Sequence, residues 1–156
     1  MVELIVGKKG KGKTKVLLDK VNGAIKEANG SIVYLDKSTK HMYELNNKVR
    51  LIDVSVYPIK NADEFVGFVC GIISQDHDLE QVYLDSFLTT AKLEGKDVTG
   101  TLEQLNAVGE KFNVKFVVSM SLDKEEIPES LQELQEQLTE ADAPYVFTSR
   151  SSLPIW

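Results

Sequence analysis

Residues 2–14 have the sequence VELIVGKKGKGKT, in which an apolar run leads directly into a loop rich in glycine and lysine. The first five of these residues predict a short buried strand, and the segment after the loop predicts a helix. Between them, Gly7, Gly12, Lys13 and Thr14 fall at the spacing G-x-x-x-x-G-K-[ST]. Such a loop turns back on itself so that its amide N–H groups point inward, and glycine makes that backbone geometry favourable. The pattern therefore predicts a loop that binds phosphate groups.

Each part of this loop has a separate role in holding a nucleotide. The first amides of the following helix and its dipole meet the same anion as the loop. Lys13 is expected to reach the β- and γ-phosphates, and the Thr14 hydroxyl is expected to hold Mg2+. A surface loop can match the pattern by chance, but the position between a strand and a helix favours nucleotide binding. The residues assigned to the nucleotide from this loop are Gly7, Lys8, Lys9, Gly10, Lys11, Gly12, Lys13 and Thr14.

Length and composition indicate an ordinary globular domain. The chain has 156 residues, of which 42% are hydrophobic and 27% charged, so we expect one domain over 1–156. No apolar stretch is long enough to cross a bilayer, and the first strand begins too early for a signal peptide to precede it. The single cysteine, Cys70, excludes a disulfide framework, so we expect a cytoplasmic protein. A net charge of −6 argues against general nucleic-acid binding, and one cysteine with two histidines argues against a zinc site.

Strand and helix patterns alternate along the rest of the chain. Residues 41–56 form the exception, because Asn46-Asn47 separates two strand-like runs and predicts a β-hairpin. Strands separated by helices need crossover connections, so the sheet should be mainly parallel with helices on both faces. The sequence therefore predicts a three-layer α/β fold. The further strands are predicted at 31–35, 81–85, 115–121 and 145–148, and the helices at 14–28, 61–73, 101–112 and 127–138.

The carboxyl ends of parallel strands share one edge, where open α/β sheets bind their ligands. This edge is expected to carry the phosphate loop, Asp36, Asp85, residues 119–121 and residues 148–152. Asp85 ends a short buried strand, and a carboxylate there can hold a water of the nucleotide's Mg2+ opposite Thr14. An aspartate that merely ends a strand and caps a turn is the alternative. We assign Thr14 and Asp85 to the metal, and Lys13 and Asp85 to catalysis.

Other polar residues at the same edge allow two interpretations each. Asp36 is either a second functional carboxylate or a cap for the polar stretch 37–40. Ser119 and Ser121 can place a hydroxyl near the γ-phosphate, or they can mark the end of a strand. Arg150 follows the last strand; it can stack on adenine or act as an arginine finger toward a neighbouring subunit's nucleotide, or it can be a solvated tail residue. We include Ser119 and Arg150 among the residues expected to contact the nucleotide.

With these motifs in place, the chain resembles the P-loop NTPases, and among them the RecA-like ATPases. Residues 7–14 match the Walker A motif, and residues 82–85 resemble Walker B. The helix 101–112 followed by the strand 115–121 is similar to the part of that fold that ends in a polar sensor. With the five predicted strands numbered along the chain, the resemblance implies the strand order 5-1-4-3-2.

The departures from that family bear on the activity. RecA-like ATPases usually carry a glutamate next to the Walker B aspartate, but here Asp85 is followed by Ser86, which leaves hydrolysis open. Glu44 in the predicted hairpin is a candidate replacement, and a surface carboxylate is the other interpretation. The D-x-x-G and N-K-x-D motifs of GTPases are absent, so ATP is expected rather than GTP. Two arginines and no evident lid disfavour a kinase that acts on phosphorylated acceptors.

The sequence thus predicts a Mg2+-dependent ATP-binding protein, a weak or partner-dependent ATPase that hydrolyses the γ-phosphate. A protein partner or a homo-oligomer would complete such a site, and no membrane association is expected. One alternative is a regulatory module that senses the nucleotide without hydrolysing it. A further alternative is a small-molecule kinase in which residues 41–57 cover the acceptor.

Overall fold

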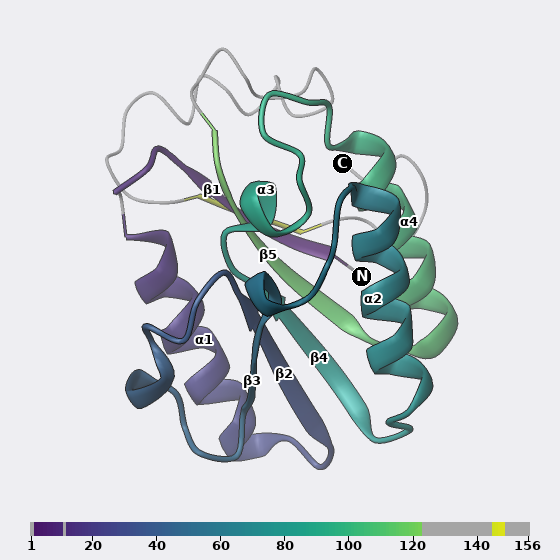
Figure 1. The fold of residues 1–156 in the computed structure, drawn as a ribbon. Coiled ribbons are helices and arrows are strands. Elements are labelled where there is room, and N and C mark those ends of the chain that lie inside the picture. Colours follow the sequence, from purple (N-terminus) through teal and green to yellow (C-terminus); the bar gives the residue numbers. More distant parts are fainter. Residues whose placement is uncertain (1, 11, 123–144, 149–156) are drawn as a thin grey trace.

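The structure, a computed structural model, describes residues 2–10, 12–122 and 145–148, and helices pack against a central sheet (Figure 1). The phosphate loop joins the first strand to the first helix, as the sequence predicts. The strands are β1 (Val2–Gly7), β2 (Ser31–Asp36), β3 (Arg50–Asp53), β4 (Leu79–Leu84), β5 (Lys115–Ser121) and β6 (Tyr145–Thr148). The α-helices are α1 (Lys13–Glu27), α2 (Ala62–Ser74), α3 (Phe87–Thr90) and α4 (Thr99–Phe112), and the 3₁₀-helices are η1 (Met42–Glu44) and η2 (Val54–Val56).

Within the described ranges, the strands form one sheet in the order β3-β2-β4-β5-β1-β6. Neighbours from β3 to β1 are parallel, and β6 is antiparallel to β1. With β3 set aside, the remaining strands stand in the predicted order 5-1-4-3-2, so the RecA-like order is confirmed. β3 adds a parallel strand at the far edge beside β2.

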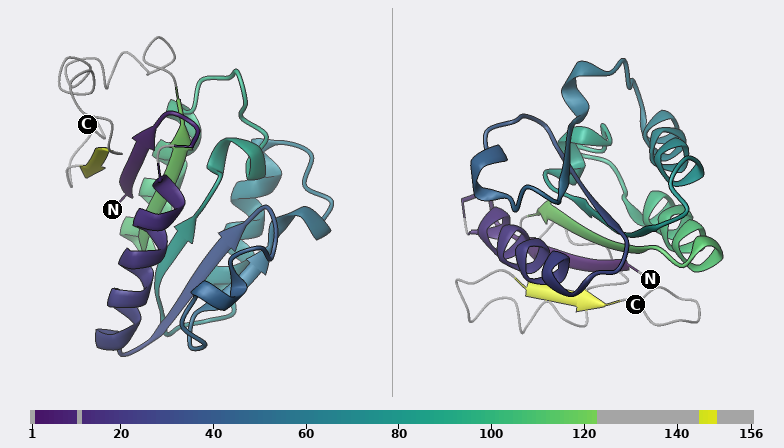
Figure 2. Two further views of the ribbon diagram at one scale, coloured as in Figure 1. Left: turned by 90° about the vertical axis from the view of Figure 1, so that its left-hand side faces the viewer. Right: turned by 90° about the horizontal axis from the view of Figure 1, so that it is seen from below.

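Helices cover both faces of the sheet, which confirms the predicted three layers. In Figure 2, α1 lies against one face, and α2 and α4 lie together against the other. Strand β4 illustrates how the sequence fills both cores. Val82 and Leu84 pack beneath α2 and α4, whereas Tyr83 between them packs beneath α1. This alternation follows from the two-residue period of a strand, and burial of both faces explains why the strands read as continuous apolar runs.

The helix α2 begins at the predicted cap. The Asn61 side chain accepts a hydrogen bond from the Glu64 N–H (2.9 Å), and the Glu64 carboxylate accepts one from the Lys60 N–H (2.7 Å). The first bond satisfies a backbone donor that the first helical turn leaves without a partner, and the second ties the residue before the cap to the same turn. The helix α4 begins at Thr99, two residues before the predicted start, because the Asp97 carboxylate accepts hydrogen bonds from the Thr99 N–H (3.0 Å) and hydroxyl (2.8 Å).

The predicted β-hairpin at 41–56 is wrong. This segment forms η1, then β3, which pairs in parallel with β2, and then η2. Asn22 of α1 explains the difference, because its side-chain amide donates to the Glu44 carbonyl (2.8 Å) and its side-chain oxygen accepts from the Asn46 N–H (2.8 Å). Backbone groups of residues 44 and 46 are therefore bound to α1 rather than to a strand partner.

The direction of β6 corrects a second expectation. Because β6 is antiparallel to β1, Tyr145 pairs with Val6 and Thr148 pairs with Glu3. Thr148 thus lies beside the amino end of β1, so its predicted place at the edge of the phosphate loop is wrong. The predicted helix 127–138 and the residues from Ser149 to Trp156 lie outside the described residues.

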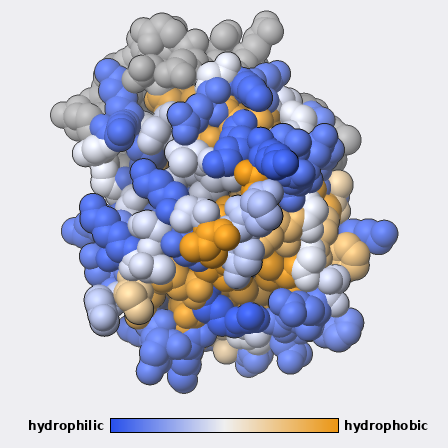
Figure 3. Space-filling view, in the orientation of Figure 1, coloured by the Kyte–Doolittle hydropathy of each residue, from blue (hydrophilic) through white to orange (hydrophobic). Residues whose placement is uncertain are grey.

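The surface is mostly hydrophilic in the orientation of Figure 3, with an apolar area over η2. Val56 and Tyr57 are exposed there, and the Tyr57 ring packs on that of Phe68 of α2, with centroids 5.0 Å apart. Among the helices that the structure describes, none combines the length and the apolar character needed to span a membrane.

Candidate functional site

The loop between β1 and α1 has the backbone that the glycine pattern predicts. Gly10 and Gly12 have φ angles of +83° and +82°, in the left-handed region that side chains disfavour. Gly12 is also the N-cap residue of α1, and its carbonyl accepts the first helical hydrogen bond from the Val16 N–H (3.2 Å). The amides at the start of α1 therefore lack helical partners, as an anion-binding helix terminus requires.

Lys13 is buried although it carries a charge. Its side chain lines the site and is 7% exposed, and its Nζ donates a 2.7 Å hydrogen bond to the Lys8 carbonyl. Burial lowers the pKa of Lys13, and the nearby Asp85 carboxylate opposes that shift. The ammonium group is thus held by the loop itself, within reach of an anion that enters it.

Asp85 follows β4 directly and is 3% exposed. Its Oδ1 accepts hydrogen bonds from the Ser119 hydroxyl (2.8 Å) and the Ser86 N–H (2.8 Å), and its Oδ2 accepts one from the Tyr34 hydroxyl (2.7 Å). The Thr14 hydroxyl lies 3.4 Å from Oδ1. The structure therefore brings together Thr14 and Asp85, the two residues that the sequence assigns to the metal, and Ser119, which it assigns to the nucleotide.

Asp36 is a second carboxylate at this edge, and the sequence left its role undecided. It ends β2, is 3% exposed and lines the same cavity as Asp85. Burial raises the pKa of Asp36, and the charge of Asp85 raises it further. Its Oδ1 accepts a 2.7 Å hydrogen bond from the Lys37 N–H, so the predicted capping of the polar stretch is also present. In the sequence, the position of Asp36 at the end of a predicted strand is the one feature that indicates a functional role.

A cavity of about 840 Å³ joins these groups. Its walls come from the phosphate loop, the segment after β2, the segment after β4 and the end of β5. Gly7 and Lys8 are not part of the lining, and Lys11 and Arg150 fall outside the described residues, so their roles stay predictions. The predicted residues that line the cavity are Lys9, Gly10, Gly12, Lys13, Thr14, Asp36, Asp85, Ser119 and Ser121.

Several residues of the lining are not predicted from the sequence. Lys37 and Lys40 follow Asp36, and Ser86 and Glu94 belong to the segment after β4. Ser86 adopts a left-handed backbone (φ 52°), which is rare for a residue with a side chain. No local pattern singles these residues out, because the folding of two connecting segments brings them to the loop.

Glu44, the proposed replacement for the missing glutamate, does not line the cavity. Its side chain is 60% exposed, and it lies 3.4 Å from His41 Nδ1. The interpretation as a surface carboxylate therefore fits the structure, and Asp36 is the buried carboxylate that lines the cavity together with Asp85.

The strand order and the loop between β1 and α1 give this chain a P-loop fold of the RecA-like type. Solved structures with this fold include the KaiC-like protein PH0186 from the hyperthermophilic archaeon Pyrococcus horikoshii OT3, with a TM-score of 0.58 and 16% identity. That match covers 86% of this chain and 66% of the archaeal chain, so this chain spans slightly less than two thirds of that protein's length. The flagellar accessory protein FlaH from Methanocaldococcus jannaschii matches with a TM-score of 0.55 and 13% identity over 97% of this chain and 73% of its own. No protein-family model and no curated protein sequence matches the chain.

Proposed function

We propose that this protein binds ATP together with Mg2+ and hydrolyses the γ-phosphate slowly, unless a partner completes the site. The observation that carries the proposal is the convergence of Lys13, Thr14 and Asp85 on one cavity beside the glycine loop. Lys13 and the amides of the loop would bind the phosphates, and Lys9 on the rim would attract the polyphosphate. The absence of guanine motifs favours ATP over GTP.

The residues present suit Mg2+. The groups at this point are hydroxyl and carboxylate oxygens of Thr14, Ser119 and Asp85, which are the ligands that this hard cation prefers. Thr14 would contribute its hydroxyl, and Asp85 would hold a water of the ion. The bound ion would neutralise charge on the phosphates, which is the chemistry that it supplies in such sites.

Asp36 is the residue best placed to accept a proton from the attacking water. Asp85 already accepts three hydrogen bonds of 2.7–2.8 Å, whereas the described residues give Asp36 one, from the Lys37 N–H. The raised pKa of Asp36 makes it a stronger base than an ordinary carboxylate. This assignment replaces the missing glutamate beside Asp85 with a carboxylate from the neighbouring strand.

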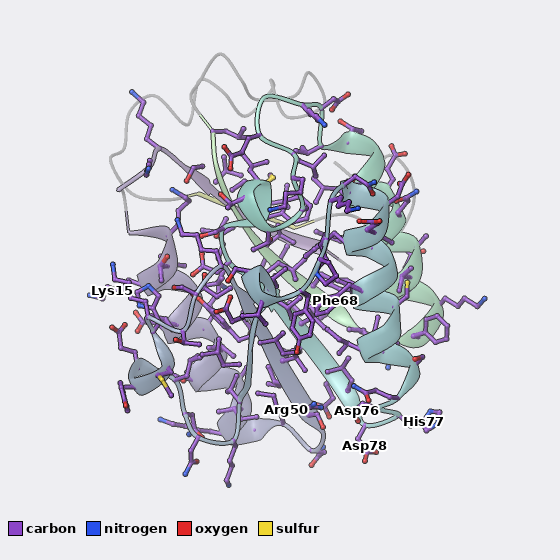
Figure 4. The ribbon with its side chains drawn as sticks, in the orientation of Figure 1. Lys15, Arg50, Phe68, Asp76, His77 and Asp78 are labelled. Carbon is purple, nitrogen blue, oxygen red and sulfur yellow. The ribbon has the colours of Figure 1, made fainter. Side chains whose placement is uncertain are left out.

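A requirement for a partner follows from the placement of arginine. Arg50, the one arginine in the part of the chain that the structure describes, pairs with Asp76 at 3.7 Å at the amino ends of the strands (Figure 4). Among the described residues the cationic groups of the cavity are therefore lysine ammonium groups. A second copy of the chain or another protein would supply the planar guanidinium that stabilises phosphoryl transfer. We propose a cytoplasmic location for this activity, as the sequence predicts.

A nucleotide sensor is the second candidate, and Ser86 in place of a glutamate favours it. Phosphate release from Mg-ATP separates the two functions. Steady release that disappears in Lys13→Ala supports an ATPase, and tight ATP binding without release at high protein concentration supports a sensor. Phosphate transfer that requires an added metabolite would identify a kinase instead.

A further inference from the structure

The hydroxyl of Tyr34 contacts the carboxylate that the proposed function assigns to Mg2+. Tyr34 lies within β2 and is fully buried, and its hydroxyl donates a 2.7 Å hydrogen bond to Asp85 Oδ2. The ring stacks on that of Tyr83, its partner in the β2–β4 register, with centroids 6.3 Å apart and planes inclined by 11°. Packing of this kind fixes the direction of the phenol.

Three separate elements hold the Asp85 carboxylate in one orientation. Ser119 of β5 and the Ser86 N–H before α3 bind Oδ1, and Tyr34 of β2 binds Oδ2. An ionised carboxylate offers about four acceptor positions, so these three short bonds leave about one. That position is on Oδ2, because Ser119 and Ser86 both bind Oδ1, and the Thr14 hydroxyl at the cavity adds a longer contact of 3.4 Å to Oδ1. Tyr34 is the donor that occupies the oxygen not held by the other two groups.

The hydrogen bond of Tyr34 differs from that of Tyr83, whose buried hydroxyl finds a local partner. Tyr83 is also buried, and its hydroxyl donates to Gln81 Oε1 (2.8 Å), two residues away on the same strand. Tyr34 instead reaches across the sheet to a residue 51 positions away, at the cavity wall. Tyr34 and Asp36 also share one face of β2, because side chains of a strand alternate. One strand thus supports the carboxylate of the metal site and carries the proposed base.

We propose that Tyr34 is a positioning residue that holds Asp85 in the orientation needed for Mg2+ to strengthen nucleotide binding. The proposal rests on the function proposed above. It assigns Tyr34 no contact with the nucleotide and no role in its binding without the metal. Removing the hydroxyl should therefore reduce the contribution of Mg2+ to affinity and leave metal-free binding intact.

Tyr34→Phe tests the proposal, with Tyr83→Phe as the matched control. The dissociation constant of a non-hydrolysable ATP analogue is measured for both variants and the wild type, with EDTA and with Mg2+. In Tyr34→Phe, the gain in affinity from Mg2+ should shrink by roughly tenfold, because a hydrogen bond to a charged group is lost. Affinity in EDTA should stay within about twofold of the wild type, because the change leaves the phosphate loop intact. Tyr83→Phe should have the wild-type affinity in EDTA and the wild-type gain in affinity from Mg2+.

Each other outcome has a defined meaning. A full Mg2+ gain in Tyr34→Phe, or an equal loss in EDTA and Mg2+, overturns the positioning role and leaves Tyr34 as a core residue. A wild type that binds the analogue no better with Mg2+ refutes the metal site of the proposed function itself. If Tyr34→Phe does not fold, NMR of tyrosine labelled at ¹³Cζ in the wild-type chain replaces it. The Tyr34 resonance should then shift when Mg2+ is added to the complex while that of Tyr83 stays, and an unmoved Tyr34 resonance overturns the proposal.

Discussion

Replacing Asp36 with asparagine separates nucleotide binding from hydrolysis in this site. Asparagine keeps a side-chain oxygen for the Lys37 N–H, so the segment after β2 should retain its conformation. The substitution also removes a buried charge whose pKa is raised by burial and by Asp85, so we expect no loss of stability at neutral pH. What the variant lacks is a group that can take a proton.

The size of the effect follows from the two buried carboxylates of the cavity, Asp36 and Asp85; Glu94, which also lines it, accepts a hydrogen bond from the Thr89 hydroxyl (3.0 Å). Asp85 has three short hydrogen bonds and cannot replace Asp36 as a base without breaking them. A positioned general base contributes roughly 10²- to 10⁴-fold to a rate, which corresponds to about 2.7–5.4 kcal/mol of activation free energy. Asp36→Asn should therefore lower the rate of γ-phosphate hydrolysis by at least roughly 100-fold and leave ATP affinity within a few fold of the wild type.

The assay is single-turnover hydrolysis of ATP with Mg2+ and enzyme in excess, accompanied by a binding titration. Asp53→Asn is the matched control, because Asp53 is the register partner of Asp36 on β3 but lies outside the cavity lining. Its carboxylate binds the Ser55 N–H (3.0 Å) and hydroxyl (2.6 Å), so that variant should lose some stability and keep its rate. Hydrolysis at the wild-type rate in Asp36→Asn would refute the assignment of the base.

Three further predictions concern the stability of the fold. Gly30→Ala should lower the free energy of unfolding by about 2 kcal/mol, because the added Cβ would stand 3.0 Å from the carbonyl carbon of Asp78 and closer still to its oxygen. Gly23→Ala has open space around the added carbon and should stabilise α1 by about 0.5–1 kcal/mol; urea denaturation checks both, and equal effects would contradict the reasoning. Burial alone would raise the pKa of Glu3, but its hydrogen bonds and ion pairs with Lys20 and Lys115 bring it below the ordinary 4.5. Its stabilisation should be present above that value and lost as the pH falls through the lowered pKa, so Glu3→Gln should flatten the acid limb of a thermal-melt series. An unchanged acid limb would show that the ion pair contributes nothing.

The fold could be predicted because its main determinants are local. The phosphate loop is defined by one short segment, residues 7–14, and the glycines at positions 10 and 12 readily adopt the left-handed backbone found there. Alternation of strands and helices then favours a mainly parallel sheet, and the strand order that the resemblance to RecA-like ATPases implies is confirmed. The region 41–56 was mistaken for a hairpin because the bonds from Asn22 join segments more than 20 residues apart. The direction of β6 was also missed, since a short apolar run has no direction.

The site residues that belong to a sequence motif could be predicted. The residues whose role depends on tertiary contacts alone could not. Thr14 and Asp85 belong to recognisable sequence patterns, and the Thr14 hydroxyl lies 3.4 Å from Asp85 Oδ1. Asp36 acquires its character from burial and from the charge of Asp85, neither of which shows in residues 31–36 as a sequence. Tyr34 reads as one more apolar residue of a buried strand, and its contact with Asp85 depends on the register of β2 with β4.

The central claim is that the loop after β1 holds the phosphates of a nucleotide. Calorimetric titration of Mg-ATP into the wild type, Lys13→Ala and Lys15→Ala tests it most directly. Lys15 is the matched control, because it is exposed and points away from the molecule (Figure 4). Lys13, by contrast, is buried and lines the cavity. We predict that Lys13→Ala weakens ATP binding by roughly tenfold or more, through loss of a charged hydrogen bond, and that Lys15→Ala changes it by less than about threefold. Equal affinities for the wild type and Lys13→Ala would contradict the account.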